Sequence, residues 1–273
     1  MERFKVREPA VAGQFYPASA QAIRKQIESF IDKKAEKADA IACILPHAGY
    51  IYSGRVAADT VSRINIKDKI ILLGPNHTGF GTAFSIMTEG IWQTPLGQVK
   101  IDSELANKIL KNSKHLEADT LAHAYEHSLE VELPFLQYFK DKFEIVPIAF
   151  LSDNVKSLKE VGQEIAAVLS EPEIKSRAMI VASSDMTHYE PADIAHKKDN
   201  EAIQAILDLD ENKLMDRIRD LNISMCGYAP AIVMLSAAKA LGAKSGKLIR
   251  YQTSGDVTGD NESVVGYAGI IIY

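Results

Sequence analysis

Three short motifs place titratable side chains directly after apolar runs that are typical of buried strands. The motifs are LPHAGYIYSG with His47, LLGPNHTG with His77, and VASSDMTH with Asp185 and His188. Proline, glycine, asparagine and serine surround these side chains, and these residues suit turns at strand ends. In a parallel sheet the carboxyl ends of the strands share one edge, where ligands gather. A single histidine after a strand is most often an ordinary loop residue, but three at one edge favour a functional site.

Asp185 and His188 are three residues apart, and their spacing permits two interpretations. Asp185 could cap a following helical turn and leave His188 exposed. Alternatively, the carboxylate could orient the imidazole, or the two could act as a general acid and base in a cleft.

Cys226 and His127 lie in less regular surroundings. Cys226 precedes Gly227 and Pro230 in NISMCGYAP, so we expect it in a turn before a helix, where backbone N–H groups and the helix dipole favour the thiolate. The alternative interpretation is that Cys226 is a small buried hydrophobic residue, as we expect for Cys43 in the middle of a strand. His127, in YEHSLEVELP, belongs either to a charged helix face or to the start of a helix that reaches the sheet edge.

Two imidazoles and one thiolate are ligands that suit Zn(II), copper or Fe(II). If His47, His77 and Cys226 converged on one ion, three protein ligands would leave a position open for water, dioxygen or substrate, as in catalytic sites. The spacing of these residues along the chain is far too long for a zinc finger.

Short apolar strands alternate with helical patterns, and the chain therefore predicts an α/β fold with a mostly parallel or mixed central sheet and helices on both faces. The expected strands cover 40–45, 69–74, 143–150, 178–185, 247–255 and 262–273, with a hairpin in 83–101. The expected helices cover 54–64, 102–112, 126–139 with a kink or a second start at Pro134, 153–170 with an Asp cap, 193–208, 211–220 and 230–241.

Length and composition predict one domain over residues 1–273 of a cytosolic protein. The chain has 47% apolar and 25% charged residues, which is ordinary for a globular protein. The net charge of −5 and the absence of a basic stripe argue against nucleic-acid binding, and no apolar run reaches membrane-spanning length. Two cysteines argue against a disulfide framework and fit a reducing compartment.

The ordered set PHAGYIYSG, LLGPNHTG, EHSLEVELPF, VASSDMTHY, MCGYAP and SVVGYAG, with REPAVAGQFYP near the start, resembles the Memo family over essentially the whole chain. The resemblance implies a fold similar to that of class III extradiol ring-cleaving dioxygenases, which are non-haem iron enzymes. It also implies that His47, His77 and Cys226 occupy metal-ligand positions, that Asp185 and His188 occupy pocket positions, and that His127 lies beside them.

The chain departs at two places from the proteins that it resembles. The extradiol enzymes use two histidines and a carboxylate, whereas Cys226 stands at the carboxylate position, so the analogy with ring cleavage is weakened. Eukaryotic Memo proteins have Arg-His where this chain has Tyr228-Ala229, and the phosphotyrosine-peptide role of animal Memo is therefore not carried over. The resemblance to prokaryotic relatives implies AMMECR1-like and radical-SAM partners in a modification pathway.

Four functions remain open at the level of sequence. The first is a redox enzyme with Fe(II) or copper on the three ligands, with His188 or His127 moving protons and Asp185 orienting a ring. The second is a zinc hydrolase that uses the same ligands, with His188 or Asp185 as the base. The third is a non-catalytic protein that binds a peptide or other partner in the old cleft, and the fourth is a metal-free Cys226 nucleophile. The substrate, a small molecule or a peptide, is not identified by the sequence.

Overall fold

A mixed β-sheet is the centre of the computed structural model, which describes residues 6–273. Along its main path the strands follow the order β1-β5-β6-β8-β3-β9-β2-β12-β10, while β11 pairs with β12, and β4 pairs with β7 and β8. The strands are β1 (Val6–Arg7), β2 (Ala42–Leu45), β3 (Lys69–Pro75), β4 (Phe84–Ile86), β5 (Ile91–Thr94), β6 (Gly97–Ile101), β7 (Glu117–Ala118), β8 (Glu144–Phe150), β9 (Ala178–Ser183), β10 (His188–Glu190), β11 (Gly246–Thr253) and β12 (Val264–Ile272).

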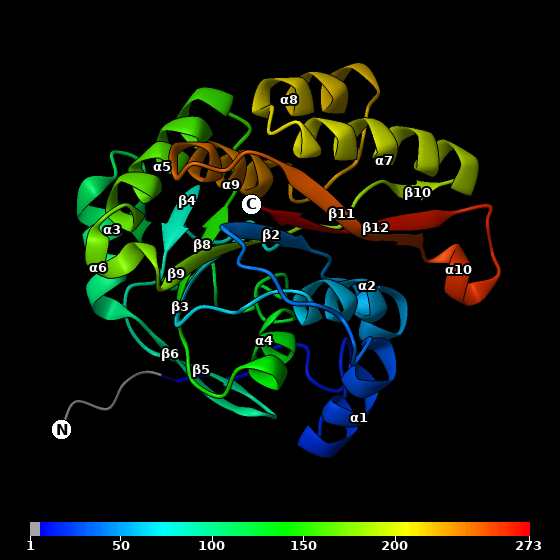
Figure 1. Cartoon of the computed structure of the whole chain (residues 1–273), viewed down its shortest axis with the longest axis horizontal. Helices are drawn as coiled ribbons and strands as arrows, with labels where there is room; N and C mark the ends of the chain where they lie inside the picture. Colours follow the sequence, from blue (N-terminus) through cyan, green and yellow to red (C-terminus); the bar gives the residue numbers. More distant parts are fainter. Residues whose placement is uncertain (1–5) are drawn as a thin grey trace.

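Helices cover both faces of this sheet (Figure 1). On one face lie α5 and α9 together with α7 and α8, and on the other lie α1, α2 and α4. The helices are α1 (Ala20–Phe30), α2 (Tyr50–Ser62), α3 (Ser103–Asn112), α4 (Leu133–Phe139), α5 (Val155–Leu169), α6 (Pro172–Lys175), α7 (Ala192–Leu207), α8 (Glu211–Asp220), α9 (Tyr228–Ala240) and α10 (Gly255–Thr258). Among residues 6–273, none of these helices has the length and apolar character needed to cross a membrane.

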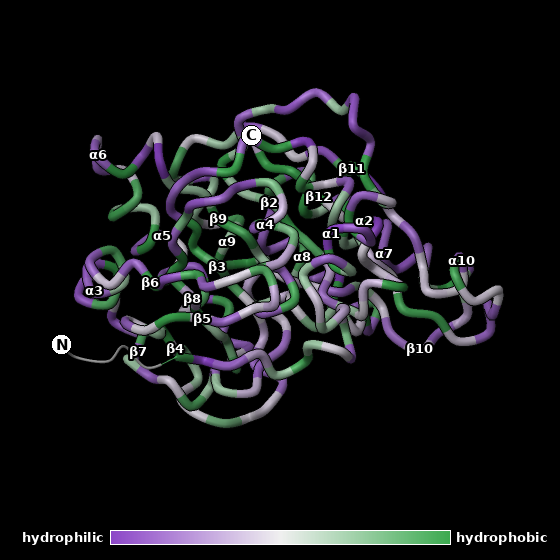
Figure 2. Tube along the Cα trace, turned by 90° about the horizontal axis from the view of Figure 1, so that it is seen from below, coloured by the Kyte–Doolittle hydropathy of each residue, from purple (hydrophilic) through white to green (hydrophobic). Residues whose placement is uncertain are grey.

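Five adjacent strands, β6, β8, β3, β9 and β2, run parallel, and β12 lies antiparallel beside β2. All four residues of β2 are buried, as are six of the seven in β3, because layers of helices lie above and below them. The apolar strands accordingly lie inside the molecule in Figure 2. This architecture confirms the predicted α/β fold with a mixed sheet and helices on both faces.

The strand predictions hold more closely than the helix predictions. Each predicted strand has an observed counterpart, and the hairpin expected in 83–101 is formed by β5 and β6, while β4 pairs with β8 instead. Helix α1 was not predicted, and α2 begins at Tyr50, four residues before its predicted start.

The helix predicted over 126–139 is wrong in its first half. Turns occupy residues 128–132, and α4 begins only at Leu133, with Pro134 in its first turn. The acidic side chains of Glu126, Glu130 and Glu132 are fully buried, so they do not form a solvated helix face. Burial decides this conformation because each carboxylate has partners elsewhere in the fold, which a regular helix would not allow it to reach.

Two smaller expectations are also corrected. The helix α5 is capped by Asn154, whose side-chain oxygen accepts from the Ser157 N–H at 3.0 Å, and not by Asp153. The sequence around His123 is typical of a surface segment, but His123 is fully buried, with its Nε2 2.9 Å from the Ser85 hydroxyl. Cys43 is buried within β2, as predicted.

Candidate metal centre

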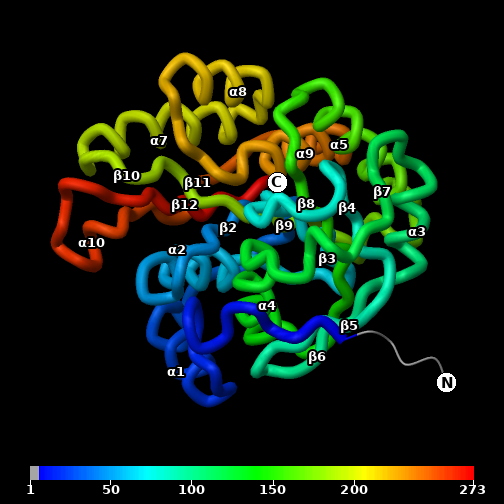
Figure 3. Tube along the Cα trace, turned by 180° about the vertical axis from the view of Figure 1, so that it is seen from behind, coloured from blue at the N-terminus to red at the C-terminus, as the bar shows by residue number. Residues whose placement is uncertain are grey.

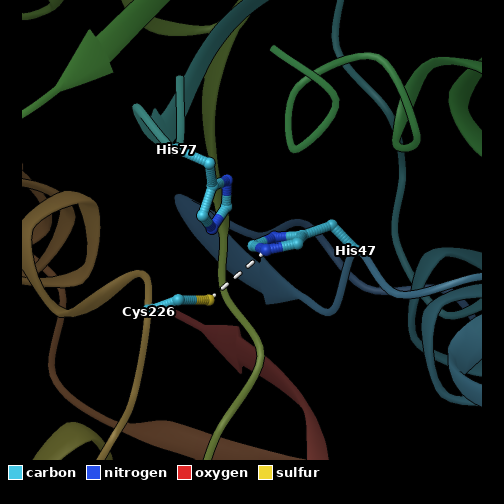
Figure 4. Close-up of side chains that lie close together, drawn as sticks. All are labelled: His47, His77 and Cys226. Atoms are coloured by element: carbon cyan, nitrogen blue, oxygen red, sulfur yellow. Dashed lines mark hydrogen bonds between the residues drawn. The ribbon is translucent and has the colours of Figure 1, made fainter. Parts of the chain in front are cut away.

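Three side chains from distant parts of the sequence converge at the carboxyl edge of the parallel strands. His47 lies two residues beyond β2, His77 two residues beyond β3, and Cys226 two residues before α9. One ligand atom from each lies within 4.8 Å of the other two, and Figure 4 shows the three side chains pointing toward one another. The Cys226 sulfur is 3.3 Å from the His47 Nε2 atom. The structure therefore brings together the three residues that the sequence analysis had selected.

The order of the strands explains this convergence. Strand β9 lies between β2 and β3 and is parallel to both, so the loops after all three strands begin side by side. The loop after β9 carries Asp185. The turn before α9 reaches the same place because Gly227 has no side chain: a Cβ there would lie 2.4 Å from the backbone oxygen of Ser183. Cys226 thus approaches the end of β9 closely.

His47 is held as a neutral imidazole with a defined orientation. It is 2% exposed, and its Nδ1 lies 2.8 Å from the Ser183 hydroxyl. Burial, with the neighbouring imidazoles of His77, His127 and His188, holds the pKa of His47 well below its usual range. A neutral imidazole has a lone pair available for a cation, and here the Nε2 atom faces Cys226.

His77 is oriented by a buried carboxylate. Its Nδ1 lies 2.9 Å from Glu126 Oε1, and its backbone N–H donates to Glu126 Oε2. Burial favours the protonated form of Glu126, but the hydrogen bonds from His77 and the Ser128 N–H outweigh that effect and lower its pKa to about 2. An ionised carboxylate on the Nδ1 side leaves the Nε2 side of His77 free, and carboxylate–histidine pairs of this kind are common behind metal ligands.

His127 lies against both histidines of the cluster. Its ring stacks on that of His77 at 4.7 Å between centroids and contacts that of His47 edge-on at 5.5 Å. Phe15 covers another side at 4.9 Å, and burial lowers the pKa of His127. The tight fit of the 128–129 turn against β3, where a Cβ on Gly74 would lie 2.6 Å from Leu129, helps to hold His127 in this place.

Asp185 and His188 are not the hydrogen-bonded pair that their spacing suggested. Asp185 accepts the backbone N–H of His47 at 2.8 Å, whereas the His188 Nδ1 lies 2.9 Å from the Ser224 carbonyl oxygen. Asp185 is 5% exposed, and burial raises its pKa to about 7 even though backbone N–H groups of His47 and Ala48 oppose the shift. Asp185 therefore orients the main chain of His47, while His188 is oriented by Ser224.

The surroundings of Cys226 oppose the thiolate that its place before a helix favours. Burial raises the pKa of the Cys226 thiol, and the nearby Asp185 carboxylate raises it further, although the Asp185 N–H donates to the sulfur at 3.3 Å. In the absence of a cation these surroundings favour the thiol form.

The sequence analysis missed the partners that lie behind the ligands. Ser183 contacts His47, Glu126 contacts His77, and Glu132 contacts Ser183 at 2.7 Å. A signal was present, because Glu130 and Glu132 alternate with Leu129, Val131 and Leu133 at a period of two, although Leu129, Leu133 and Leu136 also have helical spacing. The true surroundings of the glutamates, however, depend on strands that are far away in the sequence.

The fold and site define a mixed α/β protein with a His–His–Cys cluster at the carboxyl edge of its parallel strands. The model of the Memo family, described as Memo-like protein, matches residues 7–271, and the chain belongs to this family. A MEMO1 family protein of Aquifex aeolicus is 45% identical over 98% of this chain and 99% of its own length. A MEMO1 family protein of Methanopyrus kandleri is 43% identical over 97% of this chain and 98% of its own length. The names of these relatives specify no reaction.

Proposed function

We propose that this Memo family protein is a metal-dependent redox protein with dioxygenase-like chemistry, in which His47, His77 and Cys226 hold Fe(II) or copper. The observation that carries the proposal is the convergence of three ligand atoms within 4.8 Å, with each imidazole hydrogen-bonded through Nδ1. The donor set fits such an ion, because imidazole suits both metals and thiolate favours copper. When bound, the metal would supply Lewis acidity and one-electron redox chemistry toward dioxygen or substrate.

The protein side chains around the ligands have separate tasks in this proposal. His127 and His188 are the imidazoles that accept or donate a proton, since neither belongs to the three-ligand set. Asp185 fixes the main chain of His47 through its 2.8 Å hydrogen bond. Phe15, in edge contact with His127, gives that side of the site an apolar wall.

A zinc hydrolase is the second candidate, and the sulfur ligand is the observation that favours it. Zinc accepts two nitrogen ligands and one sulfur ligand and keeps a fourth position for water in catalytic sites. In that case His188 or Asp185 would be the general base. The two candidates share ligands and differ in the metal and in the consumption of oxygen.

Metal analysis of protein purified without oxygen tests the proposal, together with the variants His47→Ala and His115→Ala. His115 is a matched control, because it lies outside the cluster. Its Nε2 atom is 2.7 Å from Glu160 Oε2. We expect iron or copper near one equivalent in the unmodified protein and the control, and its loss in His47→Ala. Oxygen uptake should follow the metal.

Two results would decide against the redox proposal. Zinc at one equivalent without oxygen uptake would support the hydrolase. Equal metal content in His47→Ala and the unmodified protein would show that the cluster is not the metal site, and would favour partner binding in the cleft.

A further inference from the structure

The Ser183 hydroxyl lies among three buried polar groups behind His47. Its oxygen is 2.8 Å from His47 Nδ1, 2.7 Å from Glu132 Oε1 and 2.9 Å from the Ser128 carbonyl oxygen. Ser183, Ser128 and Glu132 are all fully buried, so bulk solvent does not reach them. Among residues 6–273, no group forms a hydrogen bond with the second carboxyl oxygen of Glu132.

Counting donors and acceptors assigns the protons in this group. A serine hydroxyl donates one hydrogen bond and accepts two. The Ser128 carbonyl oxygen can only accept, so it takes the Ser183 proton. The two remaining contacts must then donate to Ser183, which requires a proton on His47 Nδ1 and a proton on the Glu132 carboxyl group.

An ionised Glu132 does not satisfy the same contacts. The carboxylate and the Ser128 carbonyl oxygen would compete for one hydroxyl proton, and one buried acceptor would lose its only donor. A buried acceptor without a donor lowers the stability of the folded state. Among residues 6–273, no basic side chain pairs with Glu132, and burial raises its pKa well above the usual range.

The assigned tautomer leaves the other side of the imidazole free for the cluster. With the proton on Nδ1, the lone pair of His47 is on Nε2, and this atom lies 3.3 Å from the Cys226 sulfur.

We propose that Glu132, as an un-ionised carboxylic acid, and Ser183 are positioning residues that fix the tautomer and ring orientation of His47. The two histidines of the cluster are then supported differently. His77 donates directly to the ionised carboxylate of Glu126, which increases the electron density on its ring, whereas His47 donates to a neutral hydroxyl. The effect of this difference on metal affinity rests on the proposed function, whereas the protonation of Glu132 does not.

Infrared and NMR spectra of metal-free protein test the proton assignment. The difference spectrum between the unmodified protein and Glu132→Gln, recorded above pH 8, should contain the carbonyl band of an un-ionised carboxylic acid. In ¹⁵N-histidine spectra, His47 should carry its proton on Nδ1 in the unmodified protein and lose this preference in Ser183→Ala. Carboxylate bands alone in the difference spectrum, or a His47 proton on Nε2, would overturn the proposal.

Cobalt(II) binding to the same variants tests the positioning role. We expect Ser183→Ala to lose roughly 10–100-fold in affinity, as is common when a partner behind a metal ligand is removed. Ser183→Thr, which keeps the hydroxyl, should recover most of it. Glu132→Gln should bind like the unmodified protein, because the amide N–H₂ donates to Ser183 as the acid does; a loss equal to that of Ser183→Ala would show that the carboxylate charge is required and would contradict the proposal.

The two sets of measurements separate the two proposals. If the unmodified protein binds no cobalt(II), the proposed metal function fails, and the spectra of the metal-free protein still decide whether Glu132 is protonated. If cobalt(II) binds equally to Ser183→Ala and the unmodified protein, the metal function stands and the positioning role is refuted.

Discussion

At the scale of single residues, Cys226 links the metal proposal to proton release. Its thiol pKa is raised by burial and by Asp185, so the metal-free protein carries the proton on sulfur at neutral pH. A metal ion binds the thiolate, and the proton must leave. Metal affinity is therefore coupled to pH through this one atom.

We expect metal binding to release about one proton from Cys226 per ion between pH 6 and 8, with affinity rising about tenfold per pH unit. Calorimetric titration of cobalt(II) in buffers of different ionisation enthalpy measures the release. In Cys226→Ser the released proton should disappear together with most of the affinity. A pH-independent affinity in the unmodified protein would contradict the assignment of Cys226 as a ligand.

His123 gives a second prediction at this scale, away from the cluster. Burial lowers its pKa from 6.5 to about 4. As the pH falls below 6.5, the unfolded chain binds the proton and the folded chain resists it, so stability present above pH 6.5 is lost progressively toward pH 4. Between pH 7 and 5 the loss from this residue should be about 2 kcal/mol.

Urea unfolding of the unmodified protein and of His123→Gln at pH 7 and pH 5 measures this loss. The variant should be less sensitive to acid by the same amount, although other buried histidines contribute to the slope of both proteins. Parallel curves for the two proteins would show that His123 titrates normally.

At the scale of elements, the N-terminus of α5 gives different roles to two neighbouring residues, Asp153 and Asn154. Asn154 accepts from the Ser157 N–H, while Asp153 makes no capping hydrogen bond. Asn154→Ala should cost about 1 kcal/mol of stability, which is typical for the loss of an N-cap.

Asp153→Ala is the matched control, because the residue is adjacent and exposed like Asn154. Thermal or urea unfolding should show no comparable loss in this variant. Equal losses would mean that the charge near the helix start, and not the capping hydrogen bond, stabilises α5.

At the scale of the whole molecule, Arg7 ties the beginning of the described chain to the loop behind the cluster. It forms a 2.6 Å ion pair with Glu130 and donates to the backbone oxygens of His123 and Glu126. Its guanidinium group lies 4.1 Å over the Trp92 ring. Figure 3 shows this first segment running past β5 and α4 toward α1.

Arg7→Met should destabilise the protein by about 3–5 kcal/mol, because it leaves the Glu130 charge buried without its cation. We also expect weaker metal binding, since Glu126 orients His77 from the same loop. Lys33→Met, which removes the exposed Lys33–Glu28 pair, is the control and should leave both properties unchanged. Retained stability in Arg7→Met would mean that the fold solvates or protonates Glu130 instead.

Local sequence patterns determined which elements form and where many of them end. Apolar runs of strand length, stopped near Pro46 and Pro75, predicted β2 and β3, and they therefore placed His47 and His77 at strand ends. The pattern failed over 126–132, where apolar residues at helical spacing favoured a helix. The local spacing in this segment carries no information about the buried partners of Glu126, Glu130 and Glu132, which lie in other parts of the fold.

Only the tertiary structure decided that Cys226 meets His47 across 179 positions of sequence, and that Ser183 and Glu132 stand behind the imidazole. Strand order and the close approach at Gly227 set those distances. The physical reason is that periodicity reports which face of one element is apolar, whereas hydrogen bonds and proton positions at a buried site depend on several elements packed together.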